Sequence, residues 1–250
     1  MESREQLSEE EVSRLVEEQE KTRRATDRSY IYKCIAWIVL ILLVSYIAST
    51  IAAPRHRPGR SEMTRSISNS KQIYLGLMDF EADFGHFPDD VSAASKPALS
   101  SFRGSYSNDY LGQLIEAGYI KDETVFFAHD KRYKQRPDGV ISPPSRVLEK
   151  NECGFSYVMV EEKGKRRGLS TADNGGIPIL IAPLVNQWGS CEKKSYDMRR
   201  VYLRIDGSAR QERLTTSDQK IKIRGGKTLL ETGPATVWDK LHPEVLLPER

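Results

Sequence analysis

Two short patterns in the sequence combine residue types that act together in catalysis. Ser68 and Lys71 have the Ser-x-x-Lys spacing, which places a nucleophile and its base one helical turn apart on the same face. A hydrolase of that kind also needs a Lys-Thr-Gly strand, but Lys227-Thr228 is followed by leucine, and no Ser-Asp-Asn occurs. Gly226-Lys227-Thr228 has the ending of a phosphate-binding loop, yet Ile221 stands where such a loop requires its first glycine. We therefore assign no catalytic residue and predict that the chain is not an enzyme.

The side chains that bind metals are scattered along the sequence. The four histidines include no i,i+4 pair that would hold a metal on one helix face. Asp83, Asp89 and Asp90 offer oxygen ligands for Ca²⁺ near the end of a predicted helix, but their spacing does not match an EF-hand loop. We interpret them as solvated turn carboxylates and predict no metal site and no cofactor. The histidines are His56, His86, His129 and His242.

Composition and cysteine content set the class of protein. A chain of 250 residues that is 38% hydrophobic can bury a substantial core, and its net charge of +3 gives no reason to expect nucleic acid as a partner. Cys34 lies in an apolar run, while Cys153 and Cys191 lie farther along the chain. The second and third cysteines can form one disulfide or remain two buried thiols, and the sequence leaves both alternatives open.

The apolar run over residues 34–53 carries no charged side chain and is bounded by Lys33 and Arg55. A helix of this length spans about 30 Å, the thickness of a bilayer core. We therefore predict a transmembrane anchor from Cys34 to Ala53, in contact with membrane lipid. A buried helix and a cleaved signal peptide are the competing interpretations, but the first rarely lacks a polar face and the second usually has a shorter apolar region.

The rest of the chain is predicted to form an α+β domain. We divide the sequence into a charged cytoplasmic tail at 1–33, the anchor at 34–53, a Pro/Gly linker at 54–60 and a soluble domain at 61–250. A long helix is expected from Ser61 to a stop at Gly85 and Pro88. Its apolar stripe repeats every three or four residues. The stripe consists of Ile73, Leu77, Phe80 and Phe84.

Beyond a second, shorter helix around Tyr110–Tyr119, the apolar period changes to two, which is typical of strands. Alternation over 155–160 predicts a strand that is followed by a turn at Lys163-Gly164-Lys165. Asp206-Gly207 is a hairpin signal between two further strands. Helices followed by strands indicate an antiparallel sheet packed on the long helix. The segment Trp238–Pro248 is left unassigned.

Three stretches, taken in order, resemble type IV pilin-like proteins of the type II secretion pseudopilin kind. The first is Ser68–Leu77 continuing to Asp83–Pro88, where an Asn-x-x-Gln-Ile helix ends in an aromatic-Gly-x-aromatic-Pro exit. The second is Leu111–Ile120 with Val125-Phe126-Phe127, and the third is Val201–Ser208 with its Asp-Gly turn. The resemblance implies a pilin-like head in which a long helix packs on an antiparallel sheet.

The sequence departs from that family at the start of the apolar run. Prepilins carry a Gly-Phe-x-x-x-Glu processing site there, and Ser29–Cys34 has neither the glycine nor the glutamate. We therefore expect a fixed inner-membrane protein with a periplasmic, pseudopilin-like domain that serves as a structural or interaction module. Its protein partners would belong to a type II secretion or type IV pilus-like system. The alternative hypothesis is a membrane-tethered cell-envelope enzyme whose site cannot be recognised in the sequence.

Overall fold

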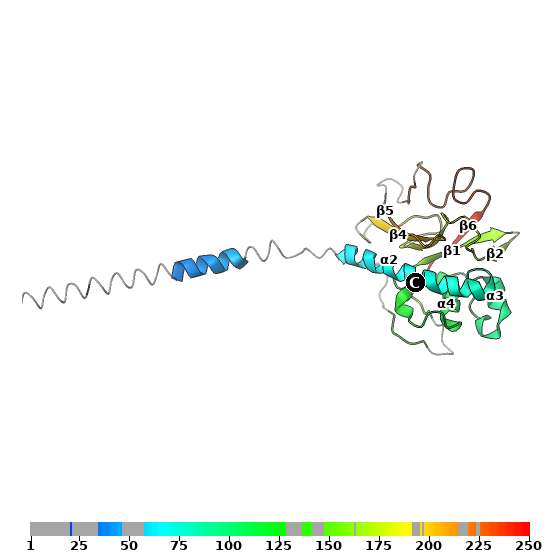
Figure 1. Cartoon of the computed structure of the whole chain (residues 1–250), viewed down its shortest axis with the longest axis horizontal. Helices are drawn as coiled ribbons and strands as arrows, with labels where there is room; N and C mark the ends of the chain where they lie inside the picture. Colours follow the sequence, from blue (N-terminus) through cyan, green and yellow to red (C-terminus); the bar gives the residue numbers. More distant parts are fainter. Residues whose placement is uncertain are drawn as a thin grey trace, which may run out of the picture. The chain divides into compact units, whose positions relative to one another are not determined.

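A computed structural model of the chain describes residues 21, 35–46, 58–128, 137–141, 148–162, 164–191, 196, 198–214, 220–223 and 226–250 (Figure 1). The chain divides into two compact units, Met1–Arg55 and His56–Arg250. Each unit is considered by itself below.

The predicted transmembrane helix is wrong. Within the stretch 34–53 the structure describes residues 35–46, which are helical. No helix in the described ranges is long and apolar enough to cross a membrane. Cys34 and Ala53, the predicted ends of the anchor, lie outside the described residues.

The second unit is an α+β domain that begins with the helix α2, Pro58–Phe84. The helix starts three residues before the predicted Ser61, at a proline, which is tolerated in the first helical turn. Its apolar stripe faces the core, with Ile73, Leu77 and Phe80 fully buried. The helix ends at Gly85, whose φ of 80° suits glycine and whose N–H donates to Glu81 O at 2.7 Å.

Shorter helices follow α2 and cover the same side of the domain. They are α3 at Asp90–Ser95, η1 at Pro97–Leu99, α4 at Ser107–Glu116 and η2 at Glu123–Phe126. Asp89 caps α3 by accepting from the backbone N–H groups of Val91 and Ser92, both at 2.8 Å. Asn69 of α2 donates to Thr124 O and Phe127 O, and these bonds fix η2 against the long helix.

A six-stranded antiparallel sheet forms the other layer. Its strands are β1 Ser156–Glu162, β2 Lys165–Arg167, β3 Pro178–Ala182, β4 Arg199–Arg204, β5 Ala209–Arg213 and β6 His242–Leu246. The register places β6 on one side of β1 and places β2 and β3, end to end, on the other. Because β4 pairs with β3 and β5 pairs with β4, the two edges of the sheet are β6 and β5.

The main hydrophobic core lies between these layers. In Figure 1 the helices α2, α3 and α4 lie on one side of the sheet, and the chain leading into β6 lies on the other. Tyr74 of α2 donates its hydroxyl proton to Ile205 O at 2.8 Å, which ties the helix to the β4–β5 hairpin. On the opposite side, the indole N–H of buried Trp238 donates to Leu229 O at 2.8 Å.

Candidate functional site

A groove follows β6, the edge strand that closes the sheet beside β1. The cavity has a volume of about 970 Å³. Every residue from His242 to Leu247 lines it. Successive side chains of a strand point to opposite faces of the sheet, so a groove over one face would be lined by every second residue. A groove lined by consecutive residues therefore runs along the edge of the strand. Free sheet edges can pair with an added strand.

The direction of the β6 backbone follows from one hydrogen bond. Leu247 O accepts from Ser107 N at 3.0 Å, on the side away from β1. Residues two apart direct their backbone groups to the same side, so the N–H and C=O of Val245 also point away from β1. Pro243 has the same parity and has no N–H to donate, which is typical of a proline on an edge strand. By this parity Val245, which is 7% exposed, is the position of β6 whose N–H and C=O both face away from β1.

The walls of the groove come from both layers of the domain. The lining includes Ser105 and Tyr106, which lead into α4, as well as Trp188 and Leu230. Trp188 is 70% exposed, a large fraction for such an apolar side chain. The Trp188 N–H and Ser190 N–H both donate to Asn186 Oδ1 at 3.1 Å, so the turn that carries the indole is ordered.

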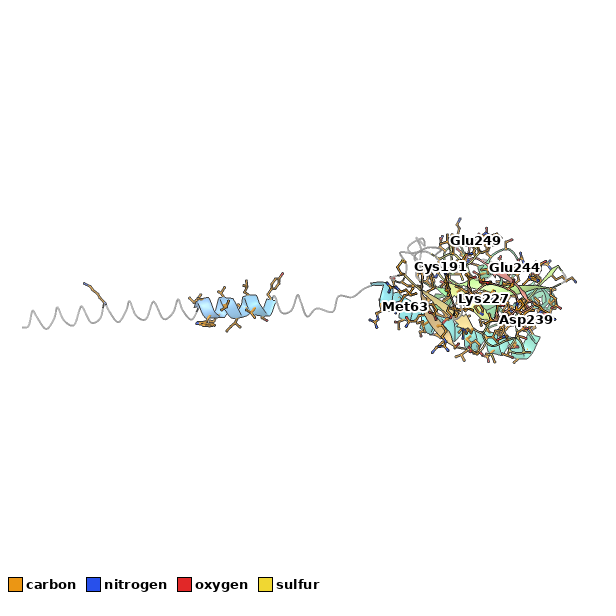
Figure 2. The ribbon with its side chains drawn as sticks, turned by 90° about the horizontal axis from the view of Figure 1, so that it is seen from above. Met63, Cys191, Lys227, Asp239, Glu244 and Glu249 are labelled. Carbon is orange, nitrogen blue, oxygen red and sulfur yellow. The ribbon has the colours of Figure 1, made fainter. Side chains whose placement is uncertain are left out.

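An ion pair holds β6 against the helical layer. Arg166 of β2 donates to Glu244 Oε1 at 2.6 Å and also contacts Gly104 O and the Tyr110 hydroxyl. Burial alone would lower the pKa of Arg166, but its bonds to Tyr110 and Glu244 outweigh this and raise the pKa. Burial raises the pKa of Tyr110 to about 12. In Figure 2 the label of Glu244 shows where this strand lies in the unit.

A second feature is a group of three carboxylates outside the groove. Glu123, Asp138 and Glu152 each place one oxygen within 4.8 Å of the others. Glu123 is 1% exposed and Glu152 is 5% exposed, while Asp138 is exposed. Their arrangement can hold a metal ion. The sequence analysis missed it because the three residues come from separate segments with no fixed spacing.

The two cysteines for which the sequence left open either a disulfide or two buried thiols are both buried and both free. The Cys153 thiol donates to Phe155 O at 3.4 Å, and the Cys191 thiol donates to Gly189 O at 3.6 Å. Burial raises the pKa of the Cys153 thiol to about 11, which is characteristic of an unreactive structural cysteine.

The other candidate site residues from the sequence lie apart from one another and make separate local contacts. Ser68 and Lys71 are exposed on α2. Asp83 accepts from the Tyr119 hydroxyl, Asp89 caps α3, and Asp90 accepts from Tyr110. The structure therefore does not bring the three aspartates together as one set of ligands.

The described histidines have different surroundings. His86 Nδ1 lies 3.2 Å from Asp89 Oδ2, and His242 lines the groove at the exposed start of β6. His56 and His129 lie outside the described residues. The groove itself was not predicted, because β6 lies in the segment that the sequence analysis left unassigned.

Comparison with known proteins finds no match to this chain among family models, curated proteins or solved structures.

Proposed function

We propose that this protein is a non-enzymatic interaction module that binds an extended segment of a partner protein along the edge of β6 that precedes Leu247. The observation that carries the proposal is the groove along that strand, which every residue from His242 to Leu247 lines. An extended peptide that adds to a sheet edge gains affinity from backbone hydrogen bonds and specificity from pockets for alternate side chains.

The lining of the groove suits a polypeptide partner. Its lining carries charges of both signs, so the groove does not select a strongly charged ligand; the charged residues are Arg166, Lys220, Glu161, Glu231 and Glu244. Exposed Trp188 offers an apolar surface to a side chain of the added strand, and aromatic anchors of this type contribute strongly to protein interfaces.

The partner that we propose is a subunit of a type II secretion or type IV pilus-like assembly. The support is the resemblance of the three stretches to pseudopilin-like proteins, together with the elements they occupy. The first stretch lies in α2 and its exit, the second covers α4 and η2, and the third covers β4 and its turn. A long helix packed on an antiparallel sheet is the arrangement that this resemblance implies.

Strand addition is tested with peptides selected from a displayed random library against the full chain. We expect selected peptides to lose affinity when alternate backbone amides are N-methylated, because only every second amide of an added strand faces β6. Methylation at the intervening positions is expected to have little effect. Binding is measured by fluorescence anisotropy of labelled peptides.

Two variants place the peptide in the groove. Trp188→Ala is expected to weaken binding by about tenfold or more, as loss of an interface anchor does. Leu75→Ala is the matched control, since Leu75 is 64% exposed on α2 and does not line the groove. A library that yields no binder, N-methyl effects without a period of two, or equal losses in both variants would refute strand addition.

The identity of the partner is tested separately by photocrosslinking in cells. A photoreactive phenylalanine analogue replaces Trp188 in one variant and Leu75 in the other. We expect a secretion or pilus-like subunit to be trapped from position 188 alone. A partner of another kind would contradict the proposed assembly while leaving strand addition intact.

A further inference from the structure

Three carboxylates meet where the turn before β1 approaches η2. Glu123 begins η2, Glu152 lies in that turn, and Asp138 belongs to the described segment 137–141. One oxygen from each lies within 4.8 Å of the other two. Two of the three side chains are withdrawn from water, so the structure holds negative charge where it is poorly solvated.

One oxygen of this cluster has no partner. Glu123 Oε1 accepts from the Gly139 N–H, but Oε2 is buried and makes no hydrogen bond within the described part of the chain. Glu152 Oε2, in contrast, accepts from Glu149 N at 2.6 Å. A buried carboxylate oxygen without a donor is costly, and a bound cation would supply the missing interaction.

The charges around the cluster are also acidic. Burial raises the pKa of Glu123, and the carboxylates of Asp138, Asp122 and Glu149 raise it further. Burial likewise raises the pKa of Glu152, with Glu123 and Asp138 adding to the effect. None of the salt bridges found between described residues includes a member of the cluster.

We infer that Glu123, Asp138 and Glu152 form a Ca²⁺-binding site. Carboxylate oxygens are hard ligands, and Ca²⁺ binds them at about 2.3–2.6 Å, so two ligands on one ion stand up to about 5 Å apart. The three oxygens all lie within 4.8 Å of one another, which is compatible with that range. Mg²⁺ requires near-ideal octahedral geometry and keeps several of its waters, so a set of three protein carboxylates suits it less. The inference does not depend on the peptide groove.

The test is Ca²⁺ titration of the full chain after removal of divalent ions with EGTA. Isothermal titration calorimetry is expected to give a dissociation constant of about 10⁻⁴ M, which lies in the weak part of the range that calcium sites span. When the Ca²⁺ concentration is 100 times this dissociation constant, the midpoint temperature of thermal unfolding is expected to rise by about 5–10 °C. Mg²⁺ at the same concentration is expected to produce a smaller rise.

Three variants assign the binding to the cluster. Asp138→Asn removes an exposed charge and is expected to weaken Ca²⁺ about tenfold without loss of the fold. Glu123→Gln keeps the size of the side chain and an acceptor for the Gly139 N–H, and is expected to abolish the calcium-dependent shift. Glu149→Gln is the matched control, because this neighbouring acid lies outside the cluster. The affinity of this variant for Ca²⁺ is expected to stay within about twofold of the wild-type value.

The inference fails if the wild-type chain gives neither heat nor a thermal shift with Ca²⁺. It fails equally if Asp138→Asn binds as tightly as the wild type, or if Glu149→Gln loses as much affinity as Glu123→Gln. Equal stabilisation by Mg²⁺ would overturn the choice of cation. Loss of binding in the two cluster variants, with retention in the control, would establish the site.

Discussion

The contact between α2 and the β4–β5 hairpin allows a quantitative test of how the helix is held on the sheet. Gly207 lies in the hairpin turn with a φ of 75°, directly beneath the ring of Tyr74. A Cβ added at Gly207 would lie 2.8 Å from Tyr74 Cε1 and 3.1 Å from Cζ. The ring cannot move away freely, because its hydroxyl donates to Ile205 O.

Gly207→Ala therefore carries two costs. An L-residue in the left-handed conformation costs about 1–2 kcal/mol, and overpacking against the ring adds about 1–3 kcal/mol. We expect the free energy of unfolding to fall by about 2–5 kcal/mol, as measured by urea denaturation of the full chain. Gly164→Ala is the matched control: its φ is 74° in the β1–β2 turn, and nothing lies within 4 Å of the added Cβ. That variant is expected to lose about 1–2 kcal/mol.

A double-mutant cycle separates the two costs. In a Tyr74→Ala background the ring is gone, so Gly207→Ala is expected to cost the same as Gly164→Ala, about 1–2 kcal/mol. Indistinguishable losses for the two glycine variants in the wild-type background would refute the reasoning. They would show that the ring does not rest on the turn as described.

Three further outcomes are expected from other contacts. Asp89→Ala should cost about 2–4 kcal/mol in urea denaturation, because it removes the α3 cap and leaves the buried Gly168 N–H unpaired; a loss below 1 kcal/mol would contradict this. Asn108→Ala should speed amide hydrogen exchange in the C-terminal tail, since Asn108 Oδ1 accepts from the Glu249 N–H; unchanged protection would contradict that role. Alkylation of the denatured, unreduced chain should modify both Cys153 and Cys191 in mass spectrometry, whereas a linked peptide pair would show a disulfide.

Local periodicity explains which elements were predictable. The stripe of α2 is encoded within one segment, and its central residues Ile73, Leu77 and Phe80 are all buried. The Asp206-Gly207 signal also predicted the β4–β5 hairpin correctly, because the turn and both strands are adjacent in the sequence. β3 begins at Pro178 and ends directly before Pro183, although this strand is central in the sheet.

Features that depend on distant pairing or on helix length were not predictable. β6 pairs with β1, which lies some eighty residues earlier, and Pro243 obscures its strand pattern. The apolar character of 34–53 suggested a spanning helix, but no helix among the described residues is long and apolar enough to cross a membrane.

The two proposed sites share the chain that leaves β6. Leu247 O accepts from Ser107 N, and Glu249 is held between Asn108 and the turn residue Asn151, whose N–H donates to Glu249 O at 2.9 Å. That turn also carries Glu152 of the acidic cluster. An ion that orders the turn would therefore restrain the end of β6, where the groove begins. Because linkage is reciprocal, any gain in peptide affinity caused by Ca²⁺ must equal the gain in Ca²⁺ affinity caused by the peptide.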